Sequence, residues 1–151
     1  MRYVETELTP AVLEALKQMS ADWAAENSCR GYYANDESDI RGNRIFLALE
    51  GDTPVGYLFG QVTRAERTST VMEENTPYFE VEELYIVPGW RSRGVGGGLF
   101  RYAESQVKQD AEYILLSTAT KNWRAILHFY IDEMGMDFWS ARLFKKIGES
   151  L

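Results

Sequence analysis

Cysteine and histidine are nearly missing from this sequence: its 151 residues contain one of each, Cys29 and His128. A single thiol cannot form an internal disulfide, and such a composition is typical of a reducing compartment, so we expect a cytoplasmic location. With one histidine available to activate a serine, a serine hydrolase is disfavoured. We expect His128 to be a helix-surface residue and Cys29 to have no role in function.

Long apolar runs and an excess of basic charge are also lacking. No stretch approaches the ~20 apolar residues of a membrane span, and the first ten residues, MRYVETELTP, lack the apolar segment of a signal peptide. Lys and Arg total 16 against 23 Asp and Glu, a net charge of −7. We therefore expect neither nucleic acid nor a membrane as partner, and the acidic excess favours a cationic or neutral one, although solubility alone would also explain it.

The length and the 45% hydrophobic content predict one domain over residues 1–151. Apolar residues at helical spacing predict helices from Thr9-Pro10, after the glycines at 94–98 and around Ile126–Met134, and the polar segment 26–43 has room for one short helix. Alternation and turn residues predict strands at 2–7, 45–49, 55–62, 78–87, 113–117 and 138–145. This order of elements predicts an α/β (α+β) sandwich with a mixed sheet, antiparallel in its first half.

The stretch ELYIVPGWRSRGVGGGLF, residues 83–100, places four glycines at a predicted helix start. Each glycine costs a helix interior roughly 1 kcal/mol relative to alanine, so the cluster needs a reason. A P-loop is excluded because Val95 stands where its lysine is required, and a dinucleotide fingerprint is disfavoured because Leu99 replaces its third glycine. Free amides at a helix N-terminus beside Arg91 and Arg93 predict a pyrophosphate cradle. The alternative is a tight turn whose glycines only relieve crowding.

This stretch closely resembles the acetyl-CoA loop of the GNAT superfamily of N-acetyltransferases: a strand, then Arg or Gln, two residues, Gly, one residue, and Gly or Ala. PVGY at 54–57 and FY at 129–130 also match, and the resemblance is specific over 78–135. It implies a GNAT-like sheet of about six to seven strands with about four helices, acetyl-CoA or coenzyme A as co-substrate, and no metal. It also implies coenzyme-binding residues on the strand edge, in the glycine loop and on the later helix: Leu84, Tyr85, Ile86, Val87, Arg91, Ser92, Arg93, Gly94, Val95, Gly96, Gly97, Gly98 and Asn122.

Three glutamates on the strand before the loop, Glu80, Glu82 and Glu83, are candidates for a base that deprotonates an amine with a pKa of ~10.4. Alternation predicts residues 80 and 82 on one face of the strand and residue 83 on the other. In family members with a glutamate base here, the spacing best matches Glu82, nine residues before Arg91. A role for Glu83, a base acting through water, and a merely solvated strand face remain alternatives.

The resemblance further implies that Tyr130 protonates the leaving thiolate. In the family a glycine usually follows this tyrosine by four residues and a coenzyme-contacting Asn precedes it by seven, whereas Gly135 is five after and Asn122 eight before. A local bulge in the helix would absorb the extra residue. The alternatives are that Tyr130 is rotated away from the sulfur or belongs to the core.

Together these features predict an acyl-CoA-dependent N-acyltransferase that works by direct attack in a ternary complex. A small cationic amine is the expected acceptor, because the segments 26–43 and 64–76, expected to wall the acceptor cleft, are both acidic. The alternatives are an acyl-CoA-binding sensor or partner module without turnover, and an acetyltransferase for protein N-termini or lysines. The sequence leaves open the identity of the amine, the acyl chain length and whether the chain forms a homodimer.

Overall fold

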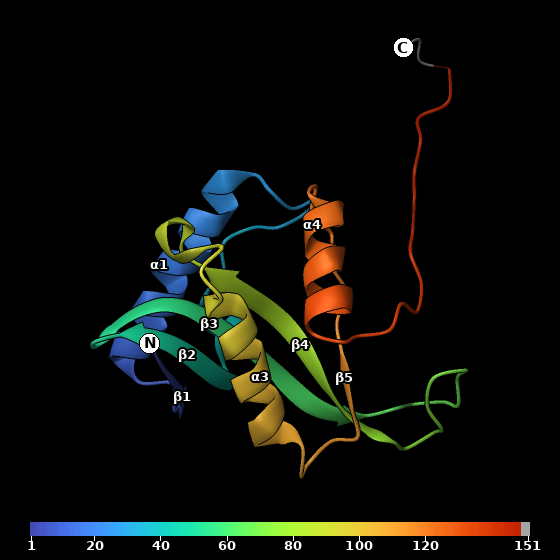
Figure 1. Ribbon diagram of the computed structural model, residues 1–151, viewed down its shortest axis with the longest axis horizontal. Coiled ribbons are helices and arrows are strands. Elements are labelled where there is room, and N and C mark those ends of the chain that lie inside the picture. The colour runs from blue at the N-terminus through green and yellow to red at the C-terminus, as the bar shows by residue number, and fades with distance from the viewer. Residues whose placement is uncertain (149–151) are drawn as a thin grey trace.

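In the computed structural model, which describes residues 1–148, five strands form a sheet in chain order, β1-β2-β3-β4-β5 (Figure 1). β1 to β4 pair antiparallel with one another, and β5 pairs parallel with β4. A parallel neighbour needs a crossover connection, and helix α3 (Val95–Val107) supplies it. The strands are β1 (Arg2–Thr6), β2 (Arg44–Glu50), β3 (Thr53–Arg64), β4 (Pro77–Ile86) and β5 (Tyr113–Leu115).

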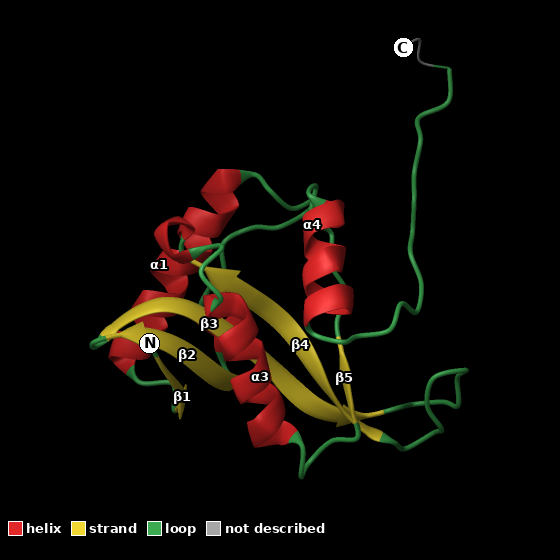
Figure 2. Cartoon of the chain, viewed as in Figure 1, coloured by secondary structure: helices red, strands yellow, loops and turns green. Residues whose placement is uncertain are grey.

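Helices cover both faces of this sheet (Figure 2). Helix α1 (Pro10–Glu26) and the short α2 (Glu37–Ile40) pack on one face, while α3 and the last helix pack on the other. The last helix begins as α4 (Trp123–Leu127) and continues as a π-helix, η2 (His128–Glu133). A 3₁₀ turn, η1 (Pro88–Trp90), follows β4. The predicted mixed α+β fold with about four helices is thereby confirmed.

Each face of the sheet carries its own hydrophobic core. In β2, Phe46 and Ala48 join the core under α3, whereas Ile45, Leu47 and Leu49 join the core under α1. This division follows from the two-residue period of a strand, which sends successive side chains to opposite faces. The sheet is therefore held on both sides by apolar contacts, which fixes the helices that carry the site.

The N-terminus of α1 is built as the sequence predicts. The side-chain oxygen of Thr9 accepts a hydrogen bond from the amide of Val12 at 3.2 Å, and Pro10 occupies the first helical turn. Leu16 and Met19 from the predicted apolar stripe are buried against the sheet. Among residues 1–148, no helix is long and apolar enough to cross a membrane.

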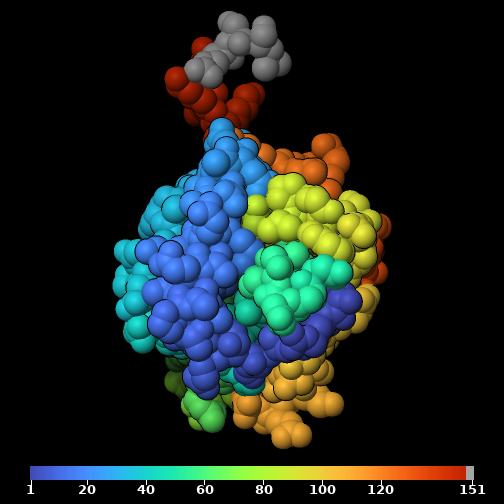
Figure 3. Space-filling view, turned by 90° about the vertical axis from the view of Figure 1, so that its left-hand side faces the viewer, coloured from blue at the N-terminus to red at the C-terminus, as the bar shows by residue number. Residues whose placement is uncertain are grey.

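The predicted strand at 138–145 is wrong, and the sheet of the described chain has five strands instead of the expected six to seven. Residues 135–146 form neither helix nor strand (Figure 2), and Phe138, Leu143 and Phe144 are 58%, 95% and 76% exposed. A strand needs a neighbour for its backbone hydrogen bonds, and β5 spans three residues instead of the predicted 113–117, so it offers a short edge. Figure 3 shows the later part of this segment, in red, standing out from the body of the domain.

Candidate active site

Helix α3 begins without a side-chain cap. Gly94 is its N-cap and has a φ of +81°, a left-handed conformation that favours glycine. The amide of Gly98 donates to the carbonyl of Gly94 at 3.0 Å. No earlier turn of the helix offers an acceptor to the amides of Val95, Gly96 and Gly97, which precede this bond. Together with the helix dipole, these free amides make the N-terminus of α3 attractive to an anion.

The glycines inside α3 do not share one role. A Cβ on Gly96 would lie 3.6 Å from Ile86 and 3.7 Å from Phe129, which are ordinary contacts. A Cβ on Gly98 would instead overlap the hydroxyl of Tyr3 on β1. The interpretation that all the glycines clear an anion cradle is therefore wrong for Gly98, which allows α3 to pack closely on β1.

The two arginines of the loop have different partners. Arg91 forms a bidentate pair with Glu26 at the end of α1, with N–O distances of 2.6 and 2.9 Å. Arg93 lies over the ring of Trp90, 4.1 Å from its centroid, and takes part in none of the ion pairs found among residues 1–148. Ser92, between them, has a φ of +59° and turns the chain toward the helix. Of these two arginines, Arg93 is thus the one without an ion-pair partner in the described chain.

Strands β4 and β5 separate after a short paired region (Figure 1). They pair at three positions, the last of which is Glu80, so within the described chain no strand lies beside the edge of β4 after Glu80. The amide of Val87 donates to Val55 on the β3 side at 2.9 Å. Because hydrogen bonding alternates along a strand, Leu84 and Ile86 then direct their backbone groups to the open edge. An extended ligand can add to such an edge.

The predicted edge residues differ in what they offer a ligand. The side chain of Tyr85 belongs to the core under α1. The carbonyl of Ile86 accepts a hydrogen bond from Nε of Arg91 at 2.8 Å, and the amide of Val87 is used by β3. Of the predicted edge residues Leu84 to Val87, Leu84 is therefore the one whose outward-facing backbone amide and carbonyl both have no partner in the described part of the domain.

A β-bulge places the three glutamates of β4. The pairing with β3 shifts register so that Val81 and Glu83 face successive residues of β3, which leaves Glu82 as the extra residue. Before the bulge Val81 packs in the core under α3, and after it Leu84 does. Glu80 and Glu83 consequently both point to the α1 face, so the prediction from simple alternation that they lie on opposite faces is wrong.

The Glu83 carboxylate is held by three neutral side chains. It accepts hydrogen bonds from the hydroxyl of Tyr57 at 2.7 Å, the hydroxyl of Tyr32 at 3.0 Å and the side-chain amide of Asn35 at 2.9 Å. Ser20, which is fully buried, lies 2.6 Å from the Tyr32 hydroxyl and accepts the backbone amide of Asn35. Burial raises the pKa of the Glu83 carboxyl, although the three donors act in the opposite direction. The sheet thus holds a partly buried carboxylate that has no basic partner among residues 1–148.

Glu80 and Glu82 are a second acidic feature of β4. Glu80 is half-buried, and Glu82 at the bulge is exposed. Burial, and to a lesser extent the negative charge of Glu82, raises the pKa of the Glu80 carboxyl. Among residues 1–148, none of the ion pairs involves Glu80, Glu82 or Glu83. Three carboxylates therefore gather on this strand with no cation to neutralise them.

Tyr130 lies on η2 and packs on the aromatic rings of Phe100 and Phe129, at centroid distances of 6.0 and 4.9 Å. Burial raises the pKa of Tyr130 to about 12, and nearby Cys29 contributes in the same direction. The hydroxyl consequently stays protonated at neutral pH and can donate a hydrogen bond. Cys29, expected from the sequence to be uninvolved, is thus a neighbour of this tyrosine.

The π-helix accounts for the unusual spacing after Tyr130. The amide of Met134 donates to the carbonyl of Phe129 at 2.9 Å, an i to i−5 bond that accommodates one more residue than an α-helical turn. Gly135 follows with a φ of +76° and ends the helix, as predicted. The local bulge proposed from the sequence to absorb the extra residue is confirmed.

Asn122 is the N-cap of α4, but its side chain makes no capping hydrogen bond. It follows an isolated antiparallel bridge between Cys29 and Thr120, which ties the loop after α1 to the approach of α4. Farther along the last helix His128 pairs with Asp132 at 2.8 Å and both are exposed, so His128 is the surface residue that the sequence predicts.

Residues 12–136 match the model of the Acetyltransferase (GNAT) family. The chain belongs to this family. The match contains β4, the glycine loop and Tyr130, so the resemblance read from the sequence is confirmed and the chain is a GNAT N-acetyltransferase. No curated protein matches the sequence.

Solved structures show the same fold across nearly the whole chain. An aminoglycoside antibiotic 6'-N-acetyltransferase from Acinetobacter haemolyticus is 16% identical, with a TM-score of 0.66 over 99% of this chain and 100% of its own. An aminoglycoside N-acetyltransferase in complex with CoA is 14% identical, with a TM-score of 0.65 over 96% and 98%. An aminoglycoside acetyltransferase from an uncultured soil metagenomic sample, in complex with sisomicin, is 16% identical, with a TM-score of 0.65 over 96% of both chains.

GNAT enzymes use acetyl-CoA, and the residues of this chain fit its phosphate groups and its pantetheine arm. The amides of Val95, Gly96 and Gly97 and the side chain of Arg93 suit the phosphate groups. The open edge of β4 at Leu84 suits an extended amide-containing arm, and it leads from the start of α3 toward the glutamates.

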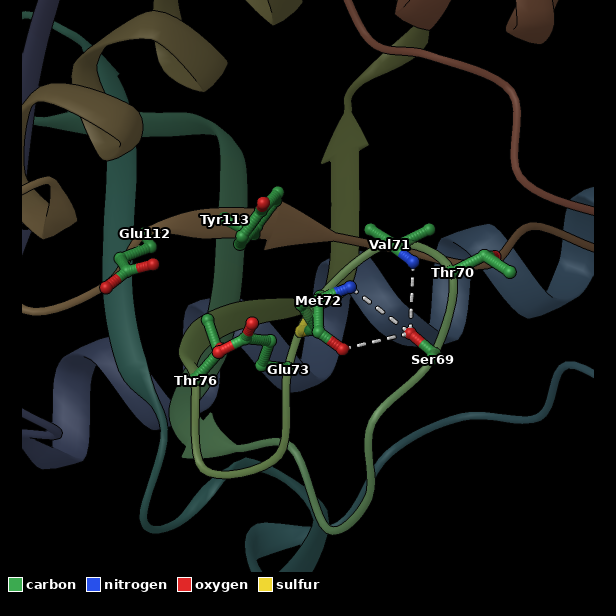
Figure 4. A pocket seen from close by; sticks show the side chains of 8 residues that line it. All are labelled: Ser69, Thr70, Val71, Met72, Glu73, Thr76, Glu112 and Tyr113. Carbon is green, nitrogen blue, oxygen red and sulfur yellow. Dashed lines mark hydrogen bonds between the residues drawn. The ribbon is translucent and has the colours of Figure 1, made fainter.

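The two acidic segments predicted to wall the acceptor cleft of the GNAT site lie apart. The loop after α1 reaches Glu83 through Tyr32 and Asn35. The connection 65–76 folds on itself at the start of β4 (Figure 1) and lines a separate open pocket of about 360 Å³ with Glu73 and Glu112 (Figure 4). Of the two segments, the first is therefore the one that contacts a β4 carboxylate.

Most acidic side chains of that first segment are already engaged within the domain. Glu26 pairs with Arg91, Glu37 pairs with Arg41 at 2.8 Å, and Asp36 and Asp39 form the capping box of α2. Asp36 and Asp39 nevertheless keep their charges, because a capping box does not neutralise them, so the negative charge available to a ligand lies on β4 and at α2. The sequence analysis did not identify Asn35 and Ser20, which support the Glu83 carboxylate. The one sequence feature that pointed to them is the position of a serine on the apolar face of α1.

Proposed function

We propose that this GNAT enzyme transfers an acetyl group from acetyl-CoA to a small, positively charged amine, which attacks the thioester directly. The observation that carries the proposal is the set of three carboxylates on β4, Glu80, Glu82 and Glu83, which have no ion-pair partner among the described residues. Unneutralised carboxylates in partly buried surroundings raise the local concentration of a cation. The aminoglycoside acetyltransferases among the structural neighbours agree with an acceptor of this kind.

An ammonium acceptor must lose a proton before it can attack, because an alkyl amine has a pKa of ~10.4. We propose that Glu82, the exposed residue at the bulge, accepts this proton together with Glu80. The raised pKa of Glu80 makes the pair a better proton acceptor near neutral pH than an isolated, solvated carboxylate. Glu83, which already accepts three hydrogen bonds, is assigned to attract and orient the cation.

The leaving thiolate needs a hydrogen-bond donor, and we assign Tyr130 to this role. The pKa of Tyr130 is about 12, whereas an ordinary thiol has a pKa of ~8.5. Complete transfer of the tyrosine proton to the thiolate is therefore unfavourable. The hydroxyl instead stabilises the charge that develops on sulfur by donating a hydrogen bond, and solvent supplies the proton later.

Binding of the coenzyme is assigned to the start of α3 and the edge of β4. The amides of Val95 to Gly97 and Arg93 hold the phosphates, and the backbone of Leu84 pairs with the pantetheine arm. Asn122, whose side chain is free of a capping bond at the start of α4, is a further contact. These residues fix the thioester between Tyr130 and the carboxylates of β4, which converts the reaction into an effectively unimolecular step.

A turnover screen tests the proposal by measuring thiol release from acetyl-CoA with a panel of amines. Polyamines, aminoglycosides and dibasic amines should outperform neutral amino acids and anionic amines, with an advantage that shrinks as salt screens it. Glu82→Gln should lower turnover of the best amine about 100-fold. Glu73→Gln, in the separate pocket of Figure 4, is the matched control and should change turnover little.

Two results of this screen would refute the proposal. A preference for anionic or apolar amines, or rates that ignore salt, would show that the β4 carboxylates do not select the acceptor. Coenzyme A binding without thiol release for any amine would favour the sensor alternative. The extra residues on either side of Tyr130 motivate that alternative, and the π-helix accounts for the one after Tyr130 but not for the one between Asn122 and Tyr130.

A further inference from the structure

Most hydrogen-bond donors of the Arg91 side chain already have acceptors inside the domain. Its Nη1 and Nη2 atoms bind the two carboxylate oxygens of Glu26 at 2.6 and 2.9 Å, and its Nε donates to the carbonyl of Ile86 at 2.8 Å. A guanidinium has five N–H groups in a rigid fork, so this arrangement leaves few for a ligand. The pair joins the end of α1 to the segment between β4 and α3, and Figure 3 shows these two parts, in light blue and yellow-green, side by side.

Tyr85 completes the contact. The guanidinium of Arg91 lies 5.2 Å from the centroid of the Tyr85 ring, and the Tyr85 hydroxyl donates to Glu26 at 2.9 Å. Hydrogen bonding from Arg91 is the largest of the effects that hold the pKa of Glu26 below its ordinary value. Glu26 therefore stays ionised at neutral pH and accepts from both partners.

The end of α1 that presents Glu26 is itself fixed to the sheet. Trp23 stacks on Tyr85 at 5.3 Å and on Tyr32 at 4.2 Å between centroids, and Tyr32 bonds to Ser20. Ser20, Trp23 and Glu26 are three residues apart, so they lie along one face of the helix. Glu26 is thus a rigid anchor for whatever it binds.

Building on the proposed function, we propose that Arg91 is a positioning residue and not a phosphate ligand: its pair with Glu26 holds the start of α3 in the geometry that binds the phosphates. Direct contact with the coenzyme then falls to the helix amides and to Arg93. The rival interpretation is that Glu26 withholds Arg91 from the phosphates and releases it when the coenzyme binds.

The two interpretations predict opposite signs for Glu26→Gln. If Arg91 positions the loop, loss of the Glu26 charge weakens coenzyme A binding, by about tenfold, because the cradle shifts. If Arg91 is a withheld ligand, the same substitution frees it and tightens binding. Arg91→Lys sharpens the test, since lysine keeps the charge but cannot form the bidentate pair and the Nε bond together.

The experiment measures coenzyme A affinity by calorimetry for Glu26→Gln, Arg91→Lys and the double variant, after thermal unfolding has shown that each is folded. We expect both single variants to lose about tenfold and the double variant to lose no more than the worse single, because they break one contact. Glu5→Gln is the control, since Glu5 on β1 forms an equally bidentate pair with Arg44 on β2, at 2.9 and 3.1 Å. The coenzyme A affinity of this variant should match that of the wild type.

A second readout separates positioning from general damage to the domain. S-acetylpantetheine lacks the pyrophosphate, so its turnover should be unchanged in Glu26→Gln while kcat/KM for acetyl-CoA falls about tenfold. Tighter or unchanged coenzyme A binding by Glu26→Gln would overturn this inference alone. Wild-type protein that does not bind coenzyme A would overturn the proposed function as well.

Discussion

Tyr57 on β3 donates a 2.7 Å hydrogen bond to Glu83 on β4, and both side chains lie on the α1 face of the sheet. Tyr57 has no exposed surface, so its hydroxyl has no water to replace Glu83. The two strands thus place a neutral donor beneath a carboxylate that has no basic partner in the described chain. This relationship can be tested through stability as well as through activity.

Tyr57→Phe should lower the free energy of unfolding by about 1–3 kcal/mol, because it removes one of the donors of a partly buried carboxylate. Urea unfolding at pH 7 measures the change. Tyr33→Phe is the matched control: Tyr33 is 73% exposed, and loss of its hydroxyl should have little effect. Equal stability of the two variants would mean that the Tyr57–Glu83 bond contributes nothing.

Glu83→Gln should change the pH dependence of stability. Burial raises the folded-state pKa of Glu83 above its unfolded value of 4.5, so folding favours the protonated form. Wild-type protein therefore loses the stability contributed by this group as pH rises from below 4.5 through the folded-state pKa, and a neutral glutamine does not. Urea unfolding between pH 4 and pH 8 should show the variant gaining relative to wild type as pH rises. A relative loss would contradict the assigned direction.

Gly98→Ala and Gly96→Ala should separate packing from helix propensity in α3. A Cβ at residue 98 overlaps the Tyr3 hydroxyl, so Gly98→Ala should destabilise the domain by about 1–3 kcal/mol. The Cβ of Gly96→Ala makes ordinary contacts at 3.6 Å or more, so this variant should be neutral or slightly more stable. Thermal unfolding of both variants checks the prediction, which fails if they shift alike.

Tyr130→Phe should lower turnover by about 100-fold or somewhat less and leave coenzyme A affinity near wild type, because the hydroxyl acts on the developing thiolate. Steady-state kinetics with the best amine, together with calorimetry, measure both quantities. The deficit should also persist up to about pH 10, since the pKa of Tyr130 is about 12 and the hydroxyl stays protonated. A variant with full turnover would exclude Tyr130 from the reaction.

Local patterns predicted most of the fold correctly. The Thr9-Pro10 helix start, the hairpin of β2 and β3 and the glycine turn before α3 each depend on residues close together in sequence. The prediction of a strand at 138–145 failed because a strand is stable only when its backbone pairs with a neighbouring strand. The apolar residues around Phe138 do not indicate whether the sheet has a free edge for such pairing. The shortness of β5 is a tertiary property that no local pattern records.

The site was predictable where it depends on local geometry and unpredictable where it depends on pairing. The amides after Gly94 and the extra residue after Tyr130 could be read from spacing alone. The bulge at Glu82 could not, because it arises from the register between β3 and β4, and it reversed the face expected for Glu83. The partnership of Arg91 with Glu26 joins residues 65 positions apart and had no sequence signature.

The exposed segment after η2 marks where a protease would first cut this enzyme. Phe138, Trp139, Leu143 and Phe144 are large apolar residues in a stretch without regular structure, whereas similar residues in the sheet are buried and hydrogen-bonded. Proteolysis needs a chain that can enter the protease in an extended form, and such a segment meets that need without unfolding. Brief digestion with a chymotrypsin-like protease would therefore trim this segment first, and the domain that contains Glu82, Arg91 and Tyr130 would remain as one resistant fragment.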